Sequence, residues 1–169
     1  MEPTTAGDQG RIEVPDDPRD VPGTFAHRLA LDVRLGDTDA MGHMNNARYL
    51  TFCESARVEY WERVTGRPFP VVTGGATDSM ILADIRVTFR SPVFMGEVLT
   101  VETRCSGIGR TSFTLEHRIT APDSDRGASR LVATAEAVQV LFDYRSDRPM
   151  AIPASTVARL EAFEGRALR

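Results

Sequence analysis

The sequence of 169 residues contains no lysine, so all 20 of its basic residues are arginines. A phosphate-binding loop of the Walker type is therefore excluded, because its lysine must contact the phosphates. Schiff-base chemistry of the kind used by aldolases and pyridoxal-phosphate enzymes is excluded for the same reason. No lysine is available as a general base either.

Cysteine is scarce, and long apolar runs are missing. Cys53 and Cys105 form no C-x-x-C pair, so we expect two small buried apolar side chains rather than a disulfide framework. No apolar run approaches the roughly 18 residues that a membrane-spanning helix needs, and the start of the chain does not resemble a signal peptide. The sequence also shows no metal-ligand spacing and no G-x-S-x-G motif of a serine hydrolase. We therefore expect a cytoplasmic protein with no metal and no membrane partner.

The net charge of −4 is confined to the beginning of the chain. Residues 1–23 contain six acidic residues, two arginines, four prolines and no aromatic residue. Such a composition predicts a disordered acidic tail. Residues 24–169 contain equal numbers of acidic and basic residues, so they predict no broad basic surface for nucleic acid. Their length suits a single domain.

Hydrophobic periodicity predicts one strand, one long helix and then a series of strands. Apolar residues recur at three- and four-residue spacing over 47–64, which is typical of an amphipathic helix that ends before Gly66 and Pro68. Residues alternate between apolar and polar in five segments, 27–34, 83–89, 98–105, 112–119 and 131–142. Turns or loops are expected at 36–46, 70–78, 107–109 and 122–127, and a short helix at 155–163. Because short links join the later strands, we expect an antiparallel sheet with the helix across one face, an α+β fold.

The turn before the long helix holds the residues best suited to chemistry. It contains Asp37, Asp39, His43, Asn45 and Asn46. The N-terminus of a helix presents unpaired N–H groups that can bind a developing oxyanion, and a nearby carboxylate can act as base or nucleophile. Asp and Asn before a helix are also typical of simple capping and turn formation, so the residues alone leave both interpretations open.

Residues 36–57, GDTDAMGHMNNARYLTFCESAR, resemble the signature of the hotdog-fold acyl thioesterases, the 4-hydroxybenzoyl-CoA thioesterase-like superfamily. Its members read D-x-D-x-x-G-H-V-N-N-x-x-Y-x-x-x-x-E. The stretches 87–97 and 109–113 resemble the family's later strand and hairpin. The resemblance covers about residues 27–143. It implies a hotdog fold, in which a roughly five-stranded antiparallel sheet wraps a long central helix, and a homodimer or homotetramer with active sites between protomers.

The resemblance also implies roles for particular residues. Asp39 matches the catalytic carboxylate, Asn46 the residue whose backbone N–H binds the thioester oxygen, and Glu54 the helix glutamate. His43 and Asn45 match the His and Asn of the H-V-N-N motif. We therefore expect hydrolysis of an acyl thioester, carried by CoA or by an acyl-carrier protein, without a cofactor. Whether Asp39 is nucleophile or general base stays open.

The phosphates of CoA would need positive groups. Arg90 and Arg110 lie at predicted strand ends beside Ser91 and Thr111, which makes these four residues candidates for CoA binding. Each arginine could equally be an ordinary exposed residue of the sheet. His27 and His117 are interpreted as structural. Two other functions remain open, a non-catalytic acyl-CoA-binding module and a hotdog enoyl-thioester hydratase or dehydratase, although the D-x-N-P-x-H motif of the lyases is missing.

Overall fold

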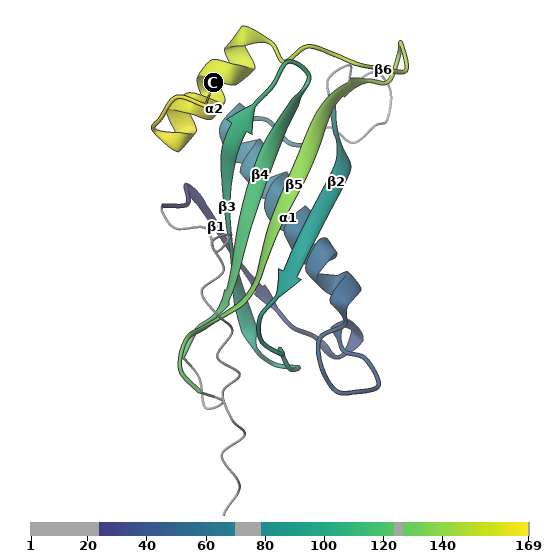
Figure 1. Ribbon diagram of the computed structural model, residues 1–169, viewed down its shortest axis with the longest axis vertical. Helices are drawn as coiled ribbons and strands as arrows, with labels where there is room; N and C mark the ends of the chain where they lie inside the picture. The colour runs from purple at the N-terminus through teal and green to yellow at the C-terminus, as the bar shows by residue number, and fades with distance from the viewer. Residues whose placement is uncertain (1–23, 70–78, 124–126, 169) are drawn as a thin grey trace, which may run out of the picture.

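The computed structural model describes residues 24–69, 79–123 and 127–168 (Figure 1). Its elements, in chain order, are β1 (His27–Asp32), a short 3-10 turn (Leu35–Asp37), α1 (Asn46–Thr65), β2 (Ser79–Phe89), β3 (Val98–Ile108), β4 (Ser112–Ala121), β5 (Arg130–Asp143), β6 (Arg148–Pro149) and α2 (Ala154–Glu164). The predicted acidic tail 1–23 and the predicted loop 70–78 lie outside the described residues.

The strands form one antiparallel sheet in the order β1-β3-β4-β5-β2, and the two-residue β6 pairs with β5. The five long strands confirm the expected sheet, although β4 and β5 run one or two residues beyond the predicted ranges and three other boundaries also differ from the prediction. β1 ends at Asp32, because a 3-10 turn follows, and β2 begins at Ser79 rather than at 83. β3 continues to Ile108 across a register shift, so the predicted turn at 107–109 is wrong and the hairpin turn begins at Gly109.

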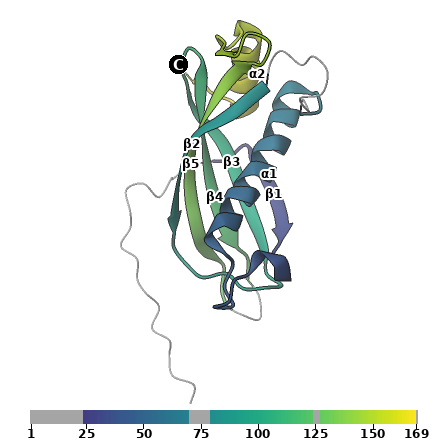
Figure 2. The same ribbon diagram turned by 90° about the vertical axis from the view of Figure 1, so that its right-hand side faces the viewer.

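Helix α1 runs along one face of the sheet (Figure 2). It begins at Asn46, capped by Asn45, and ends at Thr65, where the C-cap Gly66 takes a φ of 67°, the left-handed conformation that glycine favours. The observed helix therefore extends the predicted one by a single residue at each end. Its buried face includes Tyr49, Ala56 and Tyr60, which places both ends of the helix against the sheet.

The core under α1 consists of two apolar clusters. One surrounds the first half of the helix and contains Phe52 and Val101, and the other surrounds the second half and contains Trp61 and Leu115. Cys53 and Cys105 are both free and buried, as predicted, one in each cluster.

A row of buried polar residues crosses three strands of the sheet. The strand register places His27 of β1 opposite Thr103 of β3, and Thr103 opposite His117 of β4. All three are almost fully buried, which confirms the interpretation of the two histidines as structural. The hydroxyl of Thr103 lies 3.0 Å from Nδ1 of His117, so the two side chains share a hydrogen bond.

Helix α2 packs at the far end of the sheet from the start of α1 (Figure 1). It contributes Glu164, whose carboxylate accepts hydrogen bonds from the Tyr60 hydroxyl at 2.6 Å and from the Cys105 N–H at 2.7 Å. This helix confirms the predicted one at 155–163 and is one residue longer at each end. Neither helix of the described residues combines the length and the apolar character that crossing a bilayer requires.

Candidate active site

The first aspartate of the D-x-D pair anchors the turn that precedes α1. Asp37 accepts a hydrogen bond from the Arg34 N–H through its carboxylate and one from the Asn45 N–H through its backbone carbonyl. Its carboxylate also lies 3.5 Å from the guanidinium of Arg48, one turn into the helix. These contacts tie both ends of the turn to the helix start. Asp37 therefore has a structural role, because its carboxylate is already engaged by Arg34 and Arg48 and is not free to act as a base.

The helix start leaves one backbone donor free. The side chain of Asn45 accepts the N–H of Ala47 at 2.9 Å, and its carbonyl accepts the N–H of Arg48. Within the described part of the chain, nothing accepts the N–H of Asn46, the first residue of α1. Free N–H groups and the helix dipole make such a position attractive to a negatively charged oxygen.

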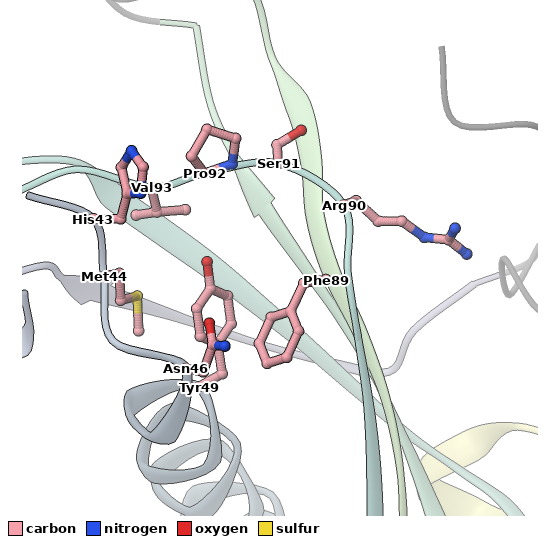
Figure 3. Close-up of a pocket in the computed structure, with 9 residues that line it drawn as sticks. All are labelled: His43, Met44, Asn46, Tyr49, Phe89, Arg90, Ser91, Pro92 and Val93. Atoms are coloured by element: carbon pink, nitrogen blue, oxygen red, sulfur yellow. The ribbon is translucent and has the colours of Figure 1, made fainter. Parts of the chain in front are cut away.

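A pocket of about 260 Å³ opens at this helix start (Figure 3). Its lining combines the end of the turn, the first turn of α1 and the segment after β2, and consists of His43, Met44, Asn46, Tyr49, Phe89, Arg90, Ser91, Pro92 and Val93. Met44, Phe89 and Val93 supply apolar walls beside the polar ones. The structure thus brings His43, Asn46, Arg90 and Ser91 of the predicted site to one cavity.

The segment that follows β2 is fixed by a buried ion pair. Glu97 is 6 % exposed, and its two carboxylate oxygens lie 2.8 and 2.9 Å from one nitrogen of Arg130. The same nitrogen donates to the Pro92 carbonyl, and Glu97 accepts the Phe94 N–H. Sequence reasoning missed both members of the pair. Gly96, just before Glu97, was a turn signal, but nothing in the sequence pointed to Arg130.

His43 is held against that segment. It forms an isolated bridge with Phe94, and the two rings meet edge to face at 5.1 Å between centroids. The next residue, Met44, donates its N–H to the Val93 carbonyl at 2.7 Å. The turn and the segment after β2 are therefore joined by backbone bonds, which form one side of the pocket.

Tyr49, which the sequence places on the buried face of the helix and at the tyrosine of the family signature, also lines the pocket. The residue is 3 % exposed, and its ring meets Phe89 edge to face at 5.0 Å. Burial, which is the largest cause, raises the pKa of this phenol to about 12, so it is neutral and able to donate at ordinary pH. Its position one turn after Asn46 is the signal that could have revealed it.

Asp39 lies at the exposed tip of the turn and does not line the pocket of a single protomer. The turn closes through hydrogen bonds between Asp39 and both Gly42 and His43, and Gly42 takes a φ of +81° that suits glycine. One carboxylate oxygen of Asp39 accepts the Met41 N–H at 2.9 Å. The turn fixes the carboxylate while leaving it open to solvent.

Glu54 lies about 12 Å along the helix from Asn46, at 1.5 Å per residue, and also outside the pocket. Its side chain is 64 % exposed and pairs at 3.0 Å with Arg57. Arg57 is itself buried and donates to the side chain of Gln139 on β5. The predicted grouping of Glu54 with the helix start is therefore not seen within one protomer.

The four candidate CoA-binding residues are divided between the two ends of the sheet. Arg90 and Ser91 follow the end of β2, where Phe89 pairs with Ala133, whereas Arg110 and Thr111 precede Ser112, which pairs with Val140. Those two positions on β5 are about 24 Å apart at 3.4 Å per residue.

Arg90 also turns away from the cavity that its backbone borders. Figure 3 shows its guanidinium directed away from His43 and Asn46. One protomer therefore does not gather the predicted CoA-binding set. Among residues 24–69, 79–123 and 127–168, no three His, Cys, Asp or Glu side chains come together as a metal site would require.

Comparisons with known proteins agree with this fold. The model of the thioesterase-like superfamily matches residues 33–160. A thioesterase superfamily protein from Jannaschia sp. CCS1 superposes with a TM-score of 0.74 and 27% identity, covering 88% of this chain and 89% of that one. A thioesterase from Thermus thermophilus, solved with coenzyme A and Zn, gives a TM-score of 0.68 and 31% identity over 85% of this chain and 98% of that one. The acyl-acyl carrier protein thioesterase ATL3 of Arabidopsis thaliana is 26% identical over 138 residues, which are 81% of this chain and 68% of that protein.

Proposed function

The chain belongs to the thioesterase-like superfamily, and we propose that it hydrolyses acyl thioesters at the pocket where α1 begins. Water adds to the thioester carbonyl carbon, the C–S bond breaks, and the products are a carboxylic acid and a free thiol. The observation that carries this proposal is that Asn46, whose backbone N–H is free, lines a pocket with both polar and apolar walls. A carbonyl oxygen placed there gains negative charge during the reaction, and the helix N-terminus stabilises that charge.

Asp39 is proposed as the carboxylate that drives the attack. Seven residues before Asn46, it is held by the turn with one oxygen bonded to the Met41 N–H. That carboxylate either removes a proton from the attacking water or attacks the carbonyl itself, with an anhydride then hydrolysed by water. His43, on the pocket wall, orients or polarises the thioester. The exposed carboxylate of Asp39 needs a cover that excludes bulk water, which a single protomer does not supply.

A second copy of the chain is proposed to supply that cover. Strand β2 is eleven residues long and, among the described residues, pairs only with β5, so its other edge is open. Leu82 and Phe89 on β2 and Leu50 on α1 are each at least 40 % exposed. An open edge next to exposed apolar side chains is suited to pairing with a symmetric copy. We therefore propose a homodimer or a tetramer built from such dimers.

The substrates are proposed to be acyl thioesters of CoA or of an acyl-carrier protein, because such thioesters appear in the names of relatives of this chain. In a dimer, Arg110 and Thr111 of one copy can approach Arg90 and Ser91 of the other, which would reunite the candidate CoA-binding residues. The proposed location is the cytoplasm.

The test is thiol release from a panel of short, long and aromatic acyl-CoAs, detected with a disulfide dye. We expect turnover of at least one class, and a loss of roughly 100-fold or more for Asp39→Asn. Asp32→Asn, which removes an exposed carboxylate at the end of β1, is the matched control and should keep full activity. Binding of acyl-CoAs without turnover, or hydration of an enoyl-CoA in place of hydrolysis, would contradict the proposal. Sedimentation of the same protein as a monomer would contradict the dimer.

A further inference from the structure

The hydroxyl of Tyr49 faces the pocket at the start of α1 and has no hydrogen-bond partner among the described residues. Tyr49 is 3 % exposed, and within the described residues no hydrogen bond reaches its hydroxyl. Buried tyrosine hydroxyls usually find a partner, because an unpaired one loses the hydrogen bonds that water would give. The other buried tyrosine of α1 follows that rule, since Tyr60 donates to Glu164 at 2.6 Å. The Tyr49 hydroxyl is instead reached by solvent from the pocket, so it is available to hydrogen-bond a molecule that binds there.

The direction of the side chain brings the hydroxyl to the helix start. Side chains on an α-helix tilt toward its N-terminus, so Tyr49, one turn after Asn46, leans back over the first turn. Figure 3 shows its hydroxyl directed toward the segment of Pro92 and Val93, in the pocket that Asn46 also lines. Asn46, with its free backbone N–H, and Tyr49, with its unpaired phenol, thus line one cavity.

We propose that the Tyr49 hydroxyl is a second hydrogen-bond donor to the carbonyl oxygen of the substrate's thioester, beside the Asn46 N–H. This inference depends on the proposed function and adds a catalytic residue to it. When the carbonyl carbon is attacked, its oxygen becomes negative, and two donors hold that charge better than one. The phenol keeps its proton throughout, so no proton transfer is involved. Met44, Phe89 and Val93 line the same pocket, and apolar side chains beside a hydrogen bond strengthen it.

The first test compares Tyr49→Phe with Tyr60→Phe. Both variants remove one buried hydroxyl from the same helix, but only Tyr49 borders the pocket. For Tyr49→Phe we expect kcat to fall by roughly 10- to 1000-fold with little change in KM and no loss of thermal stability, because the ring keeps its contact with Phe89. Tyr60→Phe should lower the melting temperature, because its bond to Glu164 is lost, and leave kcat and KM unchanged.

A second test measures the proposed hydrogen bond between the Tyr49 hydroxyl and the thioester carbonyl oxygen directly. A thioester carrying a ¹³C carbonyl is bound to Asp39→Asn, which turns over slowly, and its carbonyl stretch is recorded by infrared difference spectroscopy. Removing the phenol in Asp39→Asn/Tyr49→Phe should raise the stretching frequency. Replacing Tyr49 by 3-fluorotyrosine, a stronger donor of nearly the same size, should lower it and guards against a folding defect in the Phe variant.

The outcomes of these experiments distinguish the role of Tyr49 from the proposed thioester hydrolysis. Wild-type turnover with unchanged kcat in Tyr49→Phe, or an unchanged carbonyl frequency, would overturn the role of Tyr49 and leave thioester hydrolysis intact. No turnover of any thioester by the wild-type protein would overturn the proposed function, and this inference with it.

Discussion

Mild acid should destabilise this protein through His117, the histidine at the β4 end of the buried polar row. His117 is 1 % exposed on β4, between the two apolar clusters. Burial, helped by the positive charge of Arg57 and by His27, lowers its pKa from 6.5 to about 3. The folded protein therefore keeps this imidazole neutral at a pH where the unfolded chain has already bound a proton.

The sign and size of the change in stability with pH follow from the difference in pKa between the folded and unfolded states. Between pH 6.5 and about 3 the unfolded state holds more protons than the folded state, so the free energy of unfolding falls as the pH falls. At 1.36 kcal/mol per pKa unit, lowering the pH from 6.5 to 5 costs about 2 kcal/mol. For a chain of this length, that loss corresponds to a decrease of about 4–8 °C in melting temperature. Burial also lowers the pKa of His27, which adds to the loss in the same direction.

The assay is urea unfolding at pH 7.5 and pH 5, followed by the fluorescence of Trp61, the single tryptophan, which stacks on Phe113 in the core. The test variant is Thr103→Val/His117→Leu, in which both members of the hydrogen-bonded pair become apolar, so that no orphaned hydroxyl remains. Thr103→Val alone is the control, because it retains the titrating group.

We expect the wild-type protein and the control to lose about 2 kcal/mol more than the double variant between the two pH values. Equal losses in all three proteins would refute the reasoning, since the acid sensitivity would then come from groups other than His117. A larger loss in the double variant would contradict the neutral state of the folded imidazole.

The elements of the fold could be predicted because each follows a local pattern. The spacing of apolar residues in 47–64 located α1 to within one residue at each end, since a helix that buries one stripe repeats every 3.6 residues. Alternation located the five long strands. β6 was missed because a strand of two residues has no periodicity, and the end of β3 was misplaced because Gly107, a turn signal, lies in a strand with a register shift.

The site could be predicted only in part, because its geometry depends on contacts distant in sequence. The residues of one turn, His43, Asn45 and Asn46, could be grouped from sequence proximity alone. The placement of Arg110 at the other end of the sheet from Arg90 follows from strand order and register, which the sequence did not determine. The free hydroxyl of Tyr49 depends on which neighbours fail to reach it, and no local pattern encodes that.

Two further substitutions test how the pocket is held together. Asn45→Ala removes the side-chain hydrogen bond to the Ala47 N–H, so we expect urea unfolding to show that the free energy of unfolding falls by about 1 kcal/mol. Asn45→Asp should restore this free energy, because aspartate can accept the same bond. We expect kcat to fall in the Ala variant alone. Glu97→Gln breaks the ion pair between the buried Glu97 and the partly exposed Arg130, so the free energy of unfolding should fall by about 2 kcal/mol. Because Glu97 also accepts the Phe94 N–H, the wall beside His43 should loosen and KM should rise in this variant. A stability loss below about 1 kcal/mol, the size typical of an exposed pair, with an unchanged KM would show that the ion pair does not shape the pocket.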